Sequence, residues 1–478
     1  MINLSLPSEK GTAGRRGRAV FAGSVVLSAL LAVAGVAQAQ IPNAGPDDSV
    51  TFHGITFYGT VDIGLQYQSH GAPISDYFPA GSEDVIQKNA SHSVLGATPS
   101  NLSQSRVGLS GAEPLPGVGD WTGVFKIETF FNPQSGQISD ALKSQVQNNG
   151  RALAAQTTNV DSSVAGQAFQ QAFAGFSSKT FGTLTFGRQN TVLADGISQY
   201  DPQGASQAFS LIGFSGTAAG GGDTEDRRLN SSLKYVEKFN GFHAGAEYKF
   251  NGATGSANSA YEFSVGGDYA GLSVDGYYAF VSDAVATAAL SAAQVAELPT
   301  LGFSPSNALA GTISDNTTYA IMAMYNFGAP KIYAGYEHIE FANPKTPLAA
   351  GFDDIGGYKI AFVNAQSGAD ATFATHKQVQ IFWGGVKYTV LSKLDLTAAY
   401  YGYRQNSYAT GANTGCSTNK AGNCSGQEDV VSASADWRFS KRFDAYVGAM
   451  WSEVENGLDN GFLSKNTIDP TIGVRFRW

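Results

Sequence analysis

Residues 55–68, which read ITFYGTVDIGLQYQ, contain the pattern that decides the fold. The odd positions, from Ile55 to Tyr67, are apolar or glycine, whereas the even positions, from Thr56 to Gln68, are polar apart from Gly64 and the ring of Tyr58. Successive side chains of a β-strand point to opposite faces, so this pattern predicts a strand with an apolar environment on one side and a polar one on the other. The end of the chain repeats the alternation over Ile472, Gly473, Val474, Arg475, Phe476, Arg477 and Trp478.

One such strand would fit a soluble β-sandwich as well as a membrane barrel. The number and length of such segments along the whole chain distinguish these two fold classes. Sixteen segments of this kind follow one another, and most have at least the roughly ten residues that a tilted strand needs to cross a bilayer. They begin near Phe52, Ser103, Trp121, Gln167, Thr183, Arg228, Phe242, Glu262, Leu272, Asn316, Lys331, Lys377, Leu394, Glu428, Phe443 and Thr467.

The connections between these segments alternate in length. Short ones, such as 178–180 and 270–271, alternate with long ones, and only the connection near 251–259 breaks the rule. The long ones span about 69–102, 133–165, 191–226, 283–314, 343–374, 409–426 and 455–466. Short turns at one end and long loops at the other are typical of an outer-membrane barrel, whereas such loops count against a compact soluble domain. The sequence therefore predicts an all-β, transmembrane antiparallel β-barrel of sixteen strands with long extracellular loops and both chain ends on the periplasmic side.

The first residues indicate export. Basic residues from Lys10 to Arg18 precede an apolar run from Ala19 to Val36, which ends in Ala37-Gln38-Ala39, the small-x-small pattern that signal peptidase cleaves. We expect residues 1–39 to be a signal peptide and residues 40–478 to be the barrel. The alternative, a membrane anchor, is disfavoured by the shortness of the run, its small residues and the cleavage pattern.

Composition excludes one class of partner. The chain has 57 glycines, 21 tyrosines and 30 phenylalanines, and its formal net charge is −9. Proteins that bind nucleic acids need a basic stripe along the phosphate backbone, and this chain has only scattered bases. We expect no nucleic-acid partner.

Five stretches carry a family resemblance: residues 54–62 (GITFYGTVD), 105–111 (SRVGLSG), 176–189 (FSSKTFGTLTFGRQ), 228–235 (RLNSSLKY) and the closing strand with its terminal aromatic residue. In this order and spacing, the chain resembles the general diffusion porins of proteobacteria, the trimeric sixteen-stranded family typical of β-proteobacteria. The family usually ends in Phe. Trp478 keeps an aromatic side chain there, so we expect it to serve as the signal for the barrel assembly machinery.

The resemblance implies a constriction inside the pore. In these porins the third long loop folds into the lumen, and acids on that loop face bases on the barrel wall. Here that loop would be 191–226, with Asp195 and Asp201 where the family places its loop acids. Alternation along the strands places further charged residues on the lumen face, namely Arg106, Lys126, Glu128, Arg228 and Lys234. The alternative is that some of these bases only solvate the mouth of the barrel.

Two positions depart from the simple pattern. The family commonly carries an arginine on the fourth strand where this chain has Gln170, which weakens any expectation of strong anion selectivity. Arg188 shares its parity with Leu184 and Phe186 and would therefore point outward. Since the second long loop of trimeric porins reaches over a neighbouring subunit, we expect Arg188 at the trimer interface; a bulge at Gly187 would instead turn it inward.

The two cysteines fit an oxidising compartment. Cys416 and Cys424 lie eight positions apart in the loop 409–426, which suggests a local disulfide in an exported protein. No second cysteine pair or nearby histidine completes a zinc site, and we expect neither a metal nor a cofactor.

Two short motifs are also found in enzymes. Residues 231–234 (SSLK) match S-x-x-K and residues 314–316 (SDN) match S-D-N, two marks of serine β-lactamases. On a strand, however, Ser231 and Lys234 point to opposite faces, and a K-T-G motif is missing. We therefore expect no enzyme.

The predicted function is an outer-membrane porin for the passive diffusion of small hydrophilic solutes and ions. The expected partners are the lipid bilayer with its lipopolysaccharide, the barrel assembly machinery, those solutes and two further copies of the chain in a homotrimer. A substrate-specific channel, or a barrel that acts mainly as an adhesin or receptor, is the alternative.

Overall fold

The computed structural model describes the chain from residue 50 onward, with gaps. The described residues are 50–70, 93–134, 136, 169–212, 228–250, 259–288, 292–304, 308–344, 351–355, 358–362, 373, 375–408, 423–459 and 464–478. The predicted signal peptide, Cys416 and the part of the third loop from 213 to 227 lie outside them.

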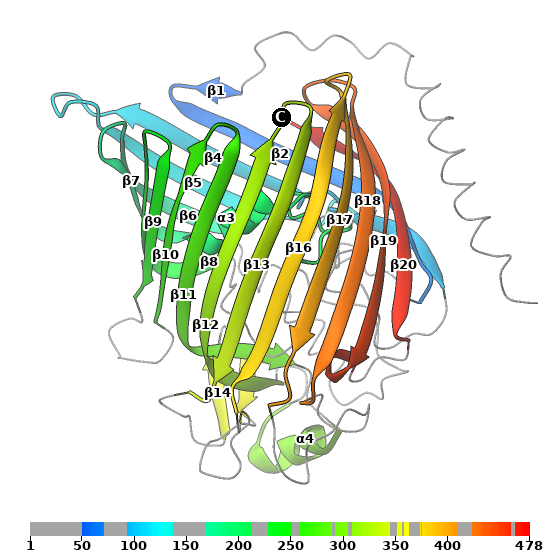
Figure 1. Ribbon diagram of the computed structural model, residues 1–478. Helices are drawn as coiled ribbons and strands as arrows, with labels where there is room; N and C mark the ends of the chain where they lie inside the picture. The colour runs from blue at the N-terminus through cyan, green and yellow to red at the C-terminus, as the bar shows by residue number, and fades with distance from the viewer. Residues whose placement is uncertain are drawn as a thin grey trace, which may run out of the picture. The chain divides into compact units, whose positions relative to one another are not determined.

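Sixteen long strands in the described part of the chain form one antiparallel sheet (Figure 1). They are β2 (Ile55–Gln68), β4 (Arg106–Pro114), β5 (Thr122–Phe130), β6 (Gln171–Ser178), β7 (Gly182–Asn190), β8 (Arg228–Phe239), β9 (Phe242–Lys249), β10 (Ala260–Tyr269), β11 (Leu272–Ala288), β12 (Ala308–Asn326), β13 (Pro330–Ala342), β16 (Lys377–Val390), β17 (Leu394–Gln405), β18 (Gly426–Arg438), β19 (Phe443–Asn456) and β20 (Asn466–Arg477). The last strand pairs with the first, from Thr60 opposite Arg477 to Gln66 opposite Thr471, so the sheet closes on itself. The predicted sixteen-stranded barrel is confirmed.

The two faces of the barrel are inverted relative to a soluble protein. On β2, Leu65 is 52% exposed, whereas Asp62 and Gln66 on the other face are buried. The same holds on β12, where Ile321 is 56% exposed and Thr318 is buried. Apolar side chains outside and polar ones inside are the arrangement of a barrel that meets lipid on its outer face.

Tight turns join the strands at one end of the barrel, here called the short-turn end. Asn240 and Gly241 both have positive φ, at 50° and 84°, as the two-residue turn between β8 and β9 requires. Ala270 and Gly271 form the turn between β10 and β11 in the same way. In Figure 1 the C-terminus lies at this end, and α4 (Ala292–Glu297) and β14 (Gly351–Ile355) lie at the other.

The second barrel strand is made of two pieces, which the sequence did not predict. β3 (Val94–Pro99) pairs with the second half of β2, and β4 pairs with its first half. Between them the chain leaves the sheet, and the buried carboxylate of Asp62 accepts hydrogen bonds from the backbone amides of Asn101, Leu102 and Ser103 at 3.3, 2.9 and 2.9 Å. Asp62 thus satisfies the amides that the interrupted ladder leaves unpaired.

Two expected loops contain strand structure. β11 and β12 continue past a register shift between Val281 and Ala284, into the range 283–314 that was predicted as loop. β14 and β15 (Tyr358–Phe362) form a hairpin in the range 343–374, and β15 pairs in parallel with the beginning of β12. These pairings join segments far apart in the chain, so the alternation of single strands could not reveal them.

The helical segments lie in the connections between strands. They are α3 (Val192–Tyr200), α4, η4 (Leu298–Leu301) and η8 (Gly457–Asp459). Among the described residues, none of the helices combines the length and the apolar character needed to cross a membrane.

Candidate channel constriction

The helix α3 begins the segment 191–212, which follows β7. Thr191 precedes the helix in extended conformation, and its hydroxyl accepts a 3.0 Å hydrogen bond from the backbone amide of Ala194. This is a standard N-cap, and Asp195 in the first turn interacts favourably with the helix dipole. One face of the helix, which includes Leu193, Ile197 and Tyr200, is fully buried against the barrel wall.

Polar contacts fix both ends of α3 to the wall. The backbone amide of Leu193 donates a 3.1 Å hydrogen bond to the carboxylate of Glu262 on β10. At the other end, the hydroxyl of Tyr200 contacts Ser273 and Asp275 on β11, and its carbonyl accepts a 3.1 Å hydrogen bond from Nε1 of Trp383 on β16. The helix is therefore bound to several strands at once.

Beyond α3 the segment contacts strands on other parts of the wall. Gln203 donates to Ser432 and accepts from Ser434, both on β18, at 3.1 and 2.8 Å. Further along, the amide of Ala208 donates a 2.8 Å hydrogen bond to the carbonyl of Asn101, next to β4. Because β10, β18 and β4 are distant parts of one closed barrel, the segment 191–212 runs through the interior.

Asp201 does not face an open channel, contrary to the prediction. It is only 2% exposed, and it accepts hydrogen bonds from the hydroxyl of Tyr401 at 2.6 Å and the amides of Gln203 and Ala205 at 3.2 and 2.6 Å. Burial raises the pKa of the Asp201 carboxyl, although these hydrogen bonds act against that shift. Its role is to fix the segment to β17, because a buried carboxylate is stable only where donors surround it.

Three of the predicted charged residues lie together on β4 and β5. The carboxylate of Glu128 is 1% exposed and lies 3.4 Å from Nζ of Lys126 and 3.8 Å from Nη1 of Arg106. Tyr58 and Gln171 donate to it at 3.0 and 3.2 Å. The side chains of Arg106 and Lys126 are 38% and 26% exposed, so the bases are the accessible part of this cluster.

Two further predicted residues, Asp195 and Lys234, join the loop to the wall. Nζ of Lys234 on β8 lies 2.6 Å from Oδ2 of Asp195 and 2.8 Å from the carbonyl of Asn190. The Asp195 side chain is 53% exposed, whereas that of Lys234 is 10% exposed. Asp195 therefore presents negative charge from α3.

Arg228 is on the inside of the protein, but strict alternation does not hold around it. Between Leu229 and Ser232, two residues of β8, Asn230 and Ser231, lie opposite the single residue Arg188 of β7, and Ser231 has a φ of 50°. Leu229, expected on the outer face, is buried with Ala260 and Val281. The guanidinium of Arg228 lies 4.9 Å from the ring centroid of Phe130, and the residue is 8% exposed. A β-bulge changes the phase of a strand, which parity counting cannot anticipate.

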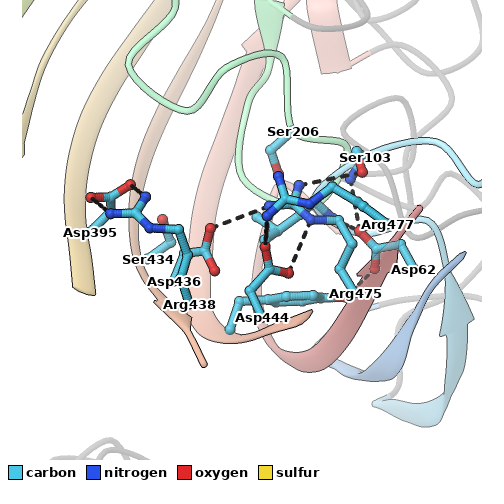
Figure 2. Close-up of polar contacts among 12 residues, drawn as sticks. Asp62, Ser103, Ser206, Asp395, Ser434, Asp436, Arg438, Asp444, Arg475 and Arg477 are labelled. Carbon is cyan, nitrogen blue, oxygen red and sulfur yellow. Dashed lines mark hydrogen bonds and ion pairs between the residues drawn. The ribbon is translucent and has the colours of Figure 1, made fainter. Parts of the chain in front are cut away.

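A larger charged cluster on β18, β19 and β20 was absent from the predicted site (Figure 2). The buried carboxylate of Asp444 binds Arg475 at 2.9 Å and Arg477 at 2.5 Å, and Arg475 also lies 3.3 Å from Asp436. Beside this group, Arg438 forms an ion pair with Asp395. Figure 2 shows Asp444, Arg475 and Arg477 beside Ser206 of the loop segment and Asp62, with Arg438 and Asp395 to one side. Alternation with Val474 and Phe476 already placed both arginines on the polar face, and that signal could have identified them.

The comparisons with known proteins decide the family. A family model described as Gram-negative porin matches residues 26–457. The chain belongs to the Gram-negative porins. An outer membrane porin protein of Bordetella pertussis is 27% identical over 230 residues, which are 48% of this porin and 48% of that relative. The match thus spans about half the length of the curated relative.

Solved structures share the fold. An anion-selective porin from Comamonas acidovorans is 18% identical and superimposes with a TM-score of 0.56, covering 89% of this porin and 99% of that chain. A trimer form of OmpT from Vibrio cholerae is 16% identical with a TM-score of 0.53, over 89% and 99% of the two chains. These structures confirm the β-barrel fold, and membership of the Gram-negative porins places the barrel in the outer membrane.

Three further predicted residues do not belong to the charged clusters described above. Arg188 of this porin is on the exposed side of β7, where its guanidinium donates to the carbonyl of Phe169 at 3.1 Å and to Asn230 at 2.5 Å. The bulge beside it lies on β8 and does not bring it among the buried residues. Cys424 is disulfide-bonded. The backbone of Trp478 pairs with Gly59 on β2 at 3.1 and 3.2 Å.

Proposed function

We propose that this porin forms a water-filled channel through which small hydrophilic solutes and ions diffuse passively across the outer membrane. The observation that carries the proposal is the segregation of charge. Arg106, Lys126 and Asp195 are partly exposed on the inside of a closed barrel, whereas the outer face carries exposed apolar side chains. Such bases would cost about 2–4 kcal/mol each on a lipid-facing surface at mid-membrane, so their place is beside water.

The loop segment narrows this channel in the proposal. Asp195 on α3 carries negative charge into the interior, and Arg106 and Lys126 carry positive charge from the wall. Opposite charges across a narrow, low-dielectric passage produce a field that acts on dipolar solutes and ions. Arg228, Glu128 and Lys234 support this arrangement through buried contacts.

A channel specific for sugars is less well supported. Such a channel would expose aromatic rings along the path of the solute, but Trp383, Tyr401 and Tyr403 inside the barrel are 4%, 0% and 0% exposed. They pack beneath the loop segment and the helix α3. Their role in the proposal is structural.

Assembly follows the family pattern in this proposal. Residues 1–39 are removed as a signal peptide, Cys416 and Cys424 form a loop disulfide, and Trp478 is the signal for the barrel assembly machinery. Arg188 lies on the exposed outer side, which suits a homotrimer interface surrounded by lipid and lipopolysaccharide. The solved trimer form of Vibrio cholerae OmpT, with the same fold, makes a trimer the natural assembly to test.

The test is conductance in a planar bilayer. The conductance of the bilayer should rise in groups of three equal steps as each trimer inserts. The current should be nearly ohmic and only weakly ion-selective. In a salt gradient, Arg106→Gln should shift the reversal potential toward cation preference and Asp195→Asn should shift it toward anion preference. Glu113→Gln, an exposed acid at the end of β4, is the control and should leave the potential unchanged. A folded barrel without conductance would refute the proposal.

A further inference from the structure

The end of α3 belongs to a closed ring of five polar side chains. Nδ1 of His243 lies 3.0 Å from Oδ1 of Asp275, and Oδ2 of Asp275 accepts a 2.5 Å hydrogen bond from the hydroxyl of Tyr200. That hydroxyl lies 2.7 Å from Oγ of Ser273, which donates a 2.6 Å hydrogen bond to Oδ1 of Asp268. Oδ2 of Asp268 lies 3.0 Å from Nε2 of His243 and completes the ring.

The ring joins the helix to the wall. His243, Asp268, Ser273 and Asp275 come from β9, β10 and β11, near the short-turn end, and Tyr200 is the last residue of α3. A change in the position of Asp275 is therefore transmitted directly to the end of the helix.

The contacts of His243 require a particular protonation state. A neutral imidazole carries one N–H, so one of its ring nitrogens presents a lone pair. Both nitrogens of His243 lie 3.0 Å from a carboxylate oxygen. Both contacts are attractive only when the ring is the imidazolium cation; in the neutral ring, one lone pair faces a carboxylate.

The two carboxylates would respond differently to the loss of that proton. Asp268 keeps a second cation, because Nζ of Lys238 lies 2.7 Å from its Oδ2. For Asp275, His243 is the only ion-pair partner among the residues that the structure describes. Deprotonation of His243 would leave Asp275 without a cation and beside the carboxylate of Asp268. Asp275 is also the group that accepts the hydrogen bond of Tyr200.

Other charged groups surround the ring. From β8, Lys234, Glu237 and Lys238 face the same cavity of about 220 Å³, and Asp195 reaches it from α3 and Tyr277 from β11. Lys234 is already paired with Asp195, and Lys238 with Asp268. The side chain of His243 is 17% exposed at this cavity, so protons reach it from solvent.

We propose that His243 is a positioning residue for α3, acting through Asp275 and Tyr200, and that its protonation determines how firmly the helix is held in the lumen. The inference rests on the proposed channel function. With the imidazolium present, Asp275 is held in place and the channel stays open with few closures. Without it, repulsion between Asp268 and Asp275 displaces the acceptor of Tyr200, and the end of α3 fluctuates into the lumen.

The experiment measures single-channel current in a planar bilayer from about pH 5 to about pH 9, the range in which a histidine can titrate. The wild type should conduct steadily at the acidic end and close more often above a transition. His243→Asn cannot be protonated, and it should close often at every pH. Tyr200→Phe keeps the histidine and both carboxylates but removes the link to α3, and it should lose the transition as well.

His376→Asn is the matched control. This histidine contacts Glu340 and is not part of the ring of five side chains, so the variant should keep the wild-type transition. Insertion and conduction of each variant show that the barrel has folded. A wild type that conducts without any pH transition overturns the inference but leaves the channel proposal intact. Persistence of the transition in His243→Asn or in Tyr200→Phe overturns it too, since the pH effect would then arise elsewhere.

Discussion

At the residue scale, the charged cluster of β18 to β20 is the feature with the most direct consequence for ion passage. Asp444 is fully buried and binds two arginines of the closing strand. Arg477 remains 39% exposed at its side chain, whereas Arg475 is 13% exposed. The charge of Asp444 thus balances bases that would otherwise make the lumen more positive.

Neutralising Asp444 should make the channel prefer anions. In Asp444→Asn the side chain keeps its size but Arg475 and Arg477 lose their shared partner, so the reversal potential in a salt gradient should shift toward anions. Breaking a buried ion pair also costs about 3–5 kcal/mol, which should lower the stability of the barrel to denaturant.

The matched control for this change is Asp429→Asn. Asp429 also binds an arginine, Arg404, at 2.7 Å, but it shares its side of β18 with the exposed Val431. Removal of its charge should leave the reversal potential where it is in the wild type. An equal shift in both variants would mean that the effect is not specific to the lumen.

At the scale of single elements, α3 depends on a close approach to β11. A Cβ atom at Gly196 would overlap the hydroxyl and ring of Tyr277. Glycine lets the helix pack directly on the strand, so this position fixes how far α3 extends into the lumen.

Gly196→Ala should displace α3 from the wall and reduce the single-channel conductance. Overpacking of this kind costs about 1–3 kcal/mol, and because the ring of Tyr277 is itself buried, we expect the helix to relieve it by moving toward the open side. Gly276→Ala on β11 adds the same methyl group where the nearest atoms are 3.8 Å away, and it should conduct like the wild type. A second change that shortens Tyr277, in Gly196→Ala/Tyr277→Leu, should recover conductance; no recovery would mean that the clash is not the cause.

At the scale of the whole molecule, barrel closure extends to the last residue. Trp478 exchanges two backbone hydrogen bonds with Gly59, and its ring packs near Phe57 and Phe476 with centroids 6.1 and 6.0 Å away. The first and last strands are thus joined by an aromatic cluster at the seam.

Trp478→Ala should weaken this seam by on the order of 2 kcal/mol, because a large side chain is removed from packed surroundings. Unfolding in urea, followed by the change in electrophoretic mobility between the folded and unfolded barrel, measures the loss. Trp478→Phe should retain most of the stability. Trp121→Ala removes a ring stacked on Phe181, away from the seam, and should cost less. Equal losses in both alanine variants would argue against a special role for closure.

The sequence by itself determined the class of fold and part of the site. Alternation with a period of two is a property of each strand alone, and it predicted the strand number, the inverted faces and the closed barrel. It also placed Arg106, Lys126 and Glu128 on one face, and the structure brings each of the two bases within 4 Å of Glu128. Local periodicity is sufficient here because the two environments of a membrane barrel impose it on every strand.

Only the tertiary structure decided which of these residues meet and which side chains are accessible. The bulge at Ser231 places Leu229 on the inner face, and the buried Asp201 accepts a hydrogen bond from Tyr401. Asp444 binds two arginines of the next strand. The ring around His243 combines a helix with three strands. The contacts of Leu229, Asp201 and Tyr200 depend on the phase of a bulge or on the path of the loop across the lumen, and those of Asp444 depend on the register between β19 and β20. That path is set by long-range packing, whereas the alternation along a strand is set by its own residues.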